Sequence, residues 1–162
     1  MSFDDLIGAI SKGDLATTRS LLESNPDLVF AKHKEKGATP LHVAASYGFE
    51  GVVRLLLDKN AEIDARANNG ATALHAAAAL GHANVVELLL ANNADIDARD
   101  SDGCTPLYAA ALKGQRATAA ALLANKADVN ARRNDGETPL RAAVKKQHAD
   151  VAEMLRQQGG HE

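Results

Sequence analysis

The sequence has few aromatic residues, one cysteine and no tryptophan. Its 162 residues include 2 Tyr and 3 Phe, and aromatic residues make up only 3% of the chain. The single cysteine, Cys104, cannot form a disulfide within the chain, which favours a reducing compartment. Hydrophobic residues nevertheless reach 46%. We therefore expect closely packed helices with small and aliphatic contacts instead of a core built on large rings.

Long apolar runs and a strong net charge are also missing. No segment approaches the roughly 20 apolar residues that a transmembrane helix requires, and the N-terminus lacks the pattern of a signal peptide. The formal net charge is −3, so no overall field attracts nucleic acid or an anionic membrane. These absences predict a cytoplasmic protein that binds neither membranes nor nucleic acid, and we expect it to be a monomer.

The signatures of common catalytic sites are absent as well. The chain has no Gly-x-Ser-x-Gly elbow, no phosphate loop and no dinucleotide fingerprint, and its six histidines show no His-x-x-x-His spacing. The acidic stretch 95–103 does not fit a calcium loop, because Ala98 stands where the first carboxylate ligand is required. We therefore expect no catalytic residues, no metal site, no cofactor and no enzymatic activity.

What the chain does contain is one short string that occurs four times. The copies begin at Gly37, Gly70, Gly103 and Gly136, 33 residues apart, and the first reads Gly-Ala-Thr-Pro-Leu-His-Val-Ala-Ala. A fixed period of this size indicates one supersecondary unit copied along the chain. Each copy buries its apolar face by stacking on its neighbours.

Each part of the string favours a particular local structure. Glycine permits a positive φ at the end of a tight turn, and the threonine two residues later can cap a helix. Proline suits the first helical turn, and the leucine and alanines that follow make a short, closely packed helix. A second helix is expected at 52–57 and 85–90, where the sequence reads Val-Val-x-Leu-Leu-Leu.

The segments between the helical pairs alternate polar and apolar residues, which predicts short extended arms ending in a turn. Arg66, Arg99 and Arg132 recur in these arms, so we expect cross-repeat ion pairs with neighbouring carboxylates. A separate expectation concerns Leu28, Val29 and Phe30, which should tuck under the first arm.

The repeated string resembles the ankyrin repeat, whose signature Thr-Pro-Leu-His-x-Ala is matched in full at 39–44. The later copies depart from it at Ala73, Tyr108 and Arg141. The resemblance implies an all-α solenoid of stacked helix-turn-helix units with short β-hairpin arms, forming one domain over 1–162. The units are 1–36, 37–69, 70–102, 103–135 and 136–162, the first and last acting as caps. The polar last unit and the initiating methionine suggest a complete protein.

The resemblance implies binding and leaves the partner open. The leading hypothesis is a non-enzymatic protein–protein interaction module that binds another protein through the concave groove of first helices and hairpin tips. The first alternative is a small-molecule or nucleotide-binding solenoid, with or without catalysis, that uses the same groove. The second is an engineered ankyrin scaffold, against which the departures from the signature argue. The resemblance also leaves hydroxylation of Asn130 open.

Alignment of the units selects the candidate binding residues. Large apolar groups at exposed positions mark an interaction site, and nearby lysines favour a partner with an apolar ridge flanked by acidic residues. In the signature itself, His42 and His75 are expected to bond the neighbouring threonine and the backbone. The groove candidates are Ser46, Tyr47, Ala79, Leu80, Cys104, Leu112, Lys113, Lys145 and Lys146. The candidates at the hairpin tips are Glu35, Lys36, Asn68, Asn69, Ser101, Asp102, Asn134 and Asp135.

Overall fold

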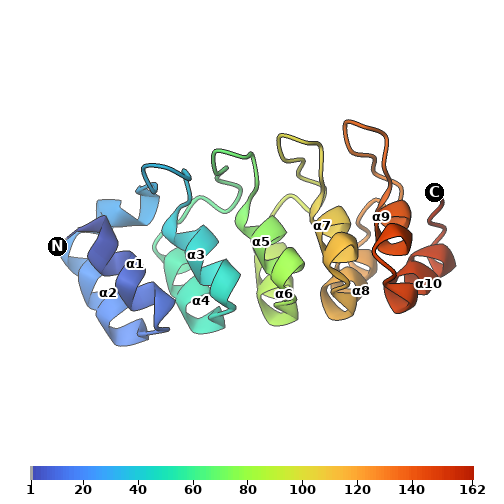
Figure 1. Cartoon of the computed structure of the whole chain (residues 1–162). Coiled ribbons are helices and arrows are strands. Elements are labelled where there is room, and N and C mark those ends of the chain that lie inside the picture. The colour runs from blue at the N-terminus through green and yellow to red at the C-terminus, as the bar shows by residue number, and fades with distance from the viewer. Residues whose placement is uncertain (1) are drawn as a thin grey trace.

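The computed structural model describes residues 2–162 as a row of five helix pairs, with an arm projecting to the same side before each pair from the second onward (Figure 1). Within this part of the chain every regular element is helical. The elements are α1 (Phe3–Ser11), α2 (Leu15–Ser24), the 3-10 helix η1 (Pro26–Phe30), α3 (Pro40–Tyr47), α4 (Glu50–Asp58), α5 (Ala73–Leu80), α6 (Ala83–Ala91), α7 (Pro106–Lys113), α8 (Arg116–Ala124), α9 (Pro139–Lys145) and α10 (Ala149–Gln157).

The repeated string starts the first helix of each of the last four pairs, as the sequence predicts. The threonine precedes the helix in extended conformation, and the Thr39, Thr105 and Thr138 hydroxyls accept the backbone N–H three residues later. The α3, α5 and α7 helices each end at a glycine with left-handed backbone. In the last pair Gln147 takes this conformation instead, with φ 63°.

The helices form two layers that share one core. First helices contact first helices along the row, second helices contact second helices, and each pair closes on itself. The signature leucines Leu41, Leu74, Leu107 and Leu140 are at most 2% exposed, and the alanines that follow them let the helices approach closely. The stacked all-α solenoid predicted from the sequence is confirmed.

The arms differ from the prediction in one respect. Each is a turn closed by main-chain hydrogen bonds of the hairpin type, such as Ala67 N–H to the Ala71 carbonyl and Gly70 N–H to the Ala67 carbonyl. None of residues 2–162 is assigned to a β-strand. The bonded stretch on either side of each turn is too short to form one, so the arms are hairpin-like turns.

The arm residues Arg66 and Arg99 form hydrogen bonds to backbone carbonyls, not to carboxylates. The Arg66 guanidinium donates to the carbonyl of Gly70 at 3.0 Å and to the carbonyl of Arg99, and the Arg99 guanidinium donates to the carbonyl of Arg132. The expected cross-repeat ion pairs are therefore wrong. A backbone carbonyl of the next arm accepts the hydrogen bond from each guanidinium, in place of the expected carboxylate.

The segment before the first arm also corrects one expectation. Leu28 and Val29 are 8% and 3% exposed, as predicted, but Phe30 is 54% exposed. The short helix η1 ends at Phe30, whose ring points outward.

Left-handed backbone occurs at Asn60, Asn93 and Lys126, which precede the later arms.

Candidate functional site

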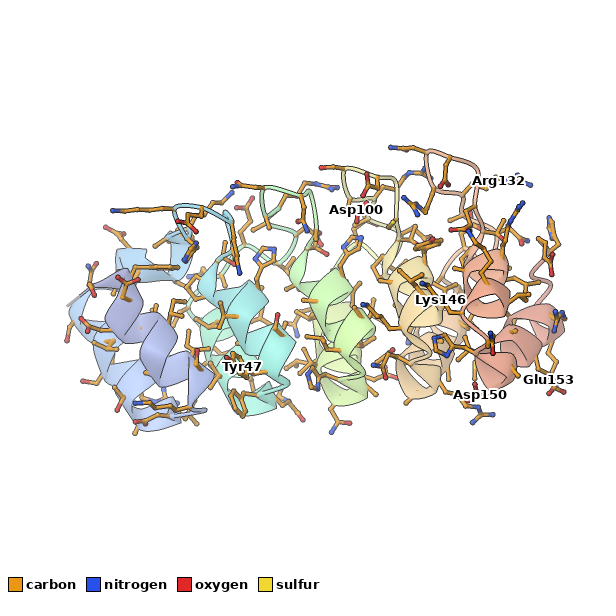
Figure 2. All side chains as sticks on the ribbon, viewed as in Figure 1. Tyr47, Asp100, Arg132, Lys146, Asp150 and Glu153 are labelled. Atoms are coloured by element: carbon orange, nitrogen blue, oxygen red, sulfur yellow. The ribbon has the colours of Figure 1, made fainter. Side chains whose placement is uncertain are left out.

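The face built by the first helices and the arms is recessed, and three of its hollows lie between neighbouring first helices. We call it the groove face and define it by α1, α3, α5, α7, α9 and the four arms. Figure 2 shows Asp100 in the arm before α7 and Tyr47 at the end of α3 that lies away from the arms. Adjacent first helices and the arm between them form each hollow, so the repeat itself creates the row of recesses.

The central hollow is the most apolar of the three. It has a volume of about 460 Å³ and lies between α3, α5 and the arms beside them. Small side chains form its floor, which leaves backbone and methyl groups facing the space. The polar groups Lys36, Asn68 and Asn69 reach it from the arm tips. The floor includes Ala38, Ala71, Ala76, Ala79, Ala109 and the groove residue Ser46.

The N-terminal hollow carries the aromatic rings. It has a volume of about 340 Å³ and is lined by Phe3, Ile7, Val43 and Tyr47 together with polar groups of the first arm. The Tyr47 ring is 52% exposed and stacks on Phe49, with ring centroids 5.7 Å apart and planes 5° apart. This stacking holds Tyr47 in place while leaving one ring face open to a partner.

The C-terminal hollow is charged. It has a volume of about 320 Å³, and its lining includes Tyr108, Arg133, Glu137, Lys145 and Lys146. Glu137 accepts from Lys145 Nζ at 2.7 Å and from the Tyr108 hydroxyl. Arg133 lies over the Tyr108 ring, 5.4 Å from its centroid, and donates to the Tyr108 hydroxyl at 3.2 Å. The hollow therefore contains a hydrogen-bonded network that joins α7, the last arm and α9.

The network shifts the titration of two of its members. Burial of the phenol, followed by its bond to Glu137, raises the pKa of Tyr108 to about 12. The hydrogen bonds from Lys145 and Tyr108 lower the pKa of the Glu137 carboxyl below its ordinary value. At neutral pH the phenol is therefore a hydrogen-bond donor, and Glu137 is a carboxylate that accepts from it.

The signature histidines hold neighbouring pairs together. His42 Nε2 lies 2.9 Å from the Ala71 carbonyl, and His75 Nε2 lies 2.9 Å from the Cys104 carbonyl. A carbonyl only accepts, so Nε2 carries the proton and Nδ1 accepts from the backbone N–H of Thr39 in one copy and Thr72 in the other. Burial lowers the pKa of both histidines. Both predicted structural roles agree with this geometry.

A second row of cross-pair bonds was not predicted. A polar residue just before the second helix of the last three pairs reaches back to the preceding pair. His82 Nε2 lies 2.8 Å from the Ser46 carbonyl, the Gln115 amide donates to the Ala79 carbonyl, and His148 Nε2 lies 3.2 Å from the Leu112 carbonyl. A Cβ added to the helix-ending glycine of the preceding pair would collide with these side chains: Gly48 faces His82, Gly81 faces Gln115, and Gly114 faces His148. The sequence signal is a polar residue recurring after Gly81, Gly114 and Gln147.

The predicted groove residues are not equally exposed. Tyr47 and Leu80 are 52% exposed, and Lys113, Lys145 and Lys146 are also exposed. Ser46, Ala79, Cys104 and Leu112 are half-buried, so Leu112 offers less apolar surface than predicted. The three hollows gather Ser46, Tyr47, Ala79, Leu112, Lys145 and Lys146, whereas Leu80, Lys113 and Cys104 lie outside their linings.

The predicted tip residues are all exposed, and several also connect one arm to the next. The Asn68 amide donates to the Glu35 carbonyl at 2.7 Å, and the Asn134 amide donates to the Ser101 carbonyl at 3.1 Å. The backbone N–H of Asn68 donates to Lys36 in the same direction. The tips are therefore fixed relative to each other. The eight tip residues are Glu35, Lys36, Asn68, Asn69, Ser101, Asp102, Asn134 and Asp135.

Other reactive groups are placed unfavourably for chemistry. Burial, followed by the charge of Asp100, raises the pKa of the Cys104 thiol to about 11, so the group is protonated at neutral pH. Within residues 2–162 no three His, Cys, Asp or Glu side chains cluster as metal ligands would. In the same part of the chain, every helix is too short or too polar to cross a membrane.

Comparison with known proteins places these features in a family. A family model described as ankyrin repeats (3 copies) matches residues 6–100 and 90–162. The chain is 44% identical over 55 residues to the serine/threonine-protein kinase VIK of Arabidopsis thaliana, a match covering 34% of this chain and 12% of the kinase. It is 42% identical over 67 residues to the probable E3 ubiquitin-protein ligase XBOS32 of Oryza sativa subsp. japonica, covering 40% of this chain and 13% of the ligase.

Both matches are confined to small parts of those proteins. The chain spans about an eighth of the length of each, so the names kinase and ligase describe those larger proteins and not the matched segments. The family model, in contrast, covers nearly the whole chain, and the stacked helix pairs with projecting arms agree with it. The chain belongs to the ankyrin repeat family, whose members are typically non-catalytic and generally serve as protein-interaction modules.

Proposed function

We propose that the chain is a non-enzymatic binding protein that grips a partner protein on the groove face. The observation that carries this proposal is the row of hollows beside exposed Tyr47 and Leu80, each 52% exposed. A solenoid has no packing reason to place large apolar groups there, and apolar surface next to a recess is typical of interaction sites. We further propose that 1–162 acts as one domain with the five units given above and that it works in the cytoplasm as a monomer.

The chemistry of the site supports binding over catalysis. The buried His42 and His75 spend both ring nitrogens on neighbouring backbone, and the Cys104 thiol is protonated at neutral pH. Tyr108 and Glu137 are bonded to each other. These groups maintain the shape of the face, so the face is preorganised for a partner and loses little entropy on binding.

A quantitative pull-down from the native lysate tests the proposal. The test variant combines Tyr47→Ala, Leu80→Ala and Leu112→Glu, and it must keep the helical circular dichroism of the parent chain. The matched control, Arg54→Ala with Glu87→Ala, alters exposed residues on the second helices α4 and α6. We expect at least one protein captured by parent and control to be lost from the test variant.

The opposite result would relocate the site. If the test variant captures every partner of the parent in the same amounts, the groove face is not the binding surface. The arm tips and the second helices would then have to be altered in turn.

A further inference from the structure

We propose that the C-terminal hollow takes an acidic segment of a protein partner, meaning a stretch of chain with at least two carboxylate side chains beside an aliphatic residue. The inference rests on the proposed function, because it assigns a partner chemistry to one end of the groove face. The residues that carry it are Arg133, Glu137, Lys145 and Lys146, with Leu112 at the edge.

Positive charge exceeds negative charge in this hollow. Arg133, Lys145 and Lys146 line it, and Glu137 is the one carboxylate among the lining residues. The chain as a whole has a formal net charge of −3, so the sign is reversed locally. Lys113, exposed at the end of α7 beside Leu112, adds to the same sign. A local field of this kind attracts carboxylates and repels other cationic surfaces.

Glu137 neutralises only part of the positive charge around it. One of its oxygens accepts from Lys145 and the other from the Tyr108 hydroxyl. Arg133 Nη1 lies 3.8 Å from Glu137 and 3.7 Å from Asp135, beyond normal hydrogen-bond length.

Two exposed cationic groups, Lys145 and Lys146, consequently remain available to a partner. Among the described residues Lys146 takes part in no ion pair. Arg133 Nε has no hydrogen-bond partner there but is buried, so Arg133 adds positive charge to the hollow without offering this atom to a partner. Lys145 is 63% exposed, so it can also donate outward. Figure 2 shows Lys146 between α7 and α9, where a bound segment would cross the row.

The hollow fits a peptide better than a nucleic acid. Single-stranded nucleic acid binds to positive grooves in which exposed aromatic rings stack on the bases. Here the Tyr108 side chain is buried, 2% exposed, and Arg133 covers its ring. Leu112, half-buried beside the hollow, offers an aliphatic contact instead. A peptide supplies both carboxylates and an aliphatic neighbour.

Glu137 competes with the incoming carboxylates, and this gives the proposal a distinctive test. Its charge lowers the positive potential of the hollow and it occupies Lys145 directly. Glu137→Gln keeps an oxygen for the Tyr108 hydroxyl and removes the charge. The substitution should therefore strengthen binding of an acidic peptide, whereas a role in shape alone predicts no gain.

The experiment begins with a random 12-residue peptide library displayed on phage and selected on the full chain. We expect Asp and Glu to be enriched among the selected peptides. A parallel selection on the Lys145→Gln, Lys146→Gln variant should lose that enrichment. Absence of acidic enrichment on the parent chain, including failure to select any peptide, overturns the proposal, as does enrichment that persists on the variant.

Affinities of one selected peptide then test the mechanism. We expect binding to weaken about two- to fivefold for Lys146→Gln, to strengthen about two- to fivefold for Glu137→Gln, and to weaken in high salt. The same peptide with Gln and Asn in place of Glu and Asp should bind at least tenfold more weakly. A 12-mer of thymidylate is the nucleic-acid probe, and tighter binding of this probe than of the peptide overturns the proposal.

The results separate this inference from the proposed function. Selected peptides that bind through Tyr47 and Leu80 without acidic enrichment contradict the inference and leave the proposed function standing. Acidic peptides that depend on Lys145 and Lys146, together with a lysate pull-down in which no partner depends on the groove face, contradict the proposed function alone.

Discussion

The junction between the third and fourth helix pairs differs from the junction between the fourth and fifth. In the first of these, His75 bonds the main-chain carbonyl of Cys104. In the second, the residue at the same place in the repeat is Tyr108, which bonds the side chain of Glu137. A carbonyl is present whichever residue follows, whereas a carboxylate is specific to one side chain. The His75 bond can therefore form with any residue at position 104. The Tyr108 bond requires the charged side chain of Glu137.

The packing of the second helices also differs between the middle and the C-terminal part of the row. The second helix α6 buries Val85, Val86 and Leu88, whereas α8 has Thr118, Ala119 and Ala121 at the corresponding places. The Thr118 hydroxyl is satisfied by the Ala78 carbonyl at 2.9 Å. The smaller side chains still bury less apolar surface, so the C-terminal part should be the less stable half of the solenoid.

Amide hydrogen exchange should show the largest of the expected effects. Each lost buried methylene removes on the order of 0.8 kcal/mol, so amides of the fourth and fifth pairs should exchange on the order of tenfold or more faster than those of the second and third. Val86→Ala makes α6 resemble α8 at one place, so it should narrow the difference in amide exchange rate between the middle and the C-terminal pairs. Uniform protection along the row would contradict the comparison.

Removal of a signature histidine comes next in size. His75→Ala leaves the Thr72 backbone N–H and the Cys104 carbonyl without their buried partner, so we expect a loss of about 1–3 kcal/mol in the free energy of unfolding. Urea titration measures it. Arg141→Ala is the matched control, because Arg141 occupies the same place in the last repeat and is exposed. Equal losses in the two variants would show that the histidine junction has no special role.

The histidine junctions should also make stability depend on pH. Burial lowers the pKa of His42 and His75, so the folded chain keeps both rings neutral while the unfolded chain takes up protons below about pH 6.5. The unfolded state then binds more protons, and stability falls as the pH decreases.

From pH 7 to 6 we expect a loss of about 1 kcal/mol in the free energy of unfolding. Thermal unfolding at both pH values measures it. A His42→Gln, His75→Gln variant should show a flatter profile, and the exposed His161→Gln should retain the parent profile. A parent profile as flat as that of the double variant would contradict the burial argument.

Tyr108→Phe should have the smallest effect of this series. It removes the hydroxyl that joins Glu137 to Arg133, at a cost of about 0.5–1.5 kcal/mol in urea unfolding. The matched control is Tyr47→Phe, because Tyr47 is 52% exposed and lies outside the bonded group of Tyr108, Glu137 and Arg133. If both substitutions cost the same, the side-chain network does not stabilise the last junction.

Local sequence was sufficient to predict the architecture because the repeated residues act within a few positions of themselves. Thr39 caps the helix that starts at Pro40, and Gly48 ends it. The leucine that occupies the Leu41 position is buried in all four copies of the string. These effects depend on backbone geometry near each residue, so a fixed spacing reveals them.

The parts that escaped prediction depend on partners contributed by a distant backbone. Arg66 bonds the carbonyl of Arg99 instead of a carboxylate, and His82 bonds the carbonyl of Ser46. Carbonyls are invisible in a sequence, because every residue has one. The alignment also selected Leu112 and Lys145 for the groove, but the network of Arg133, Tyr108 and Glu137 required three elements to be placed together.

The main-chain bonding of the middle repeats has a consequence for how such a chain can lengthen. His42 and His75 make the same bond to the following repeat, so residues 70–102 present to their C-terminal neighbour what they receive from their N-terminal one. A tandem duplication of this segment would therefore join without any compensating substitution. A duplication of residues 103–135 would keep one Tyr108 beside Glu137 and place the other Tyr108 beside a repeat that has Cys104 in place of Glu137. We therefore expect a chain with residues 70–102 duplicated to fold more stably than one with residues 103–135 duplicated.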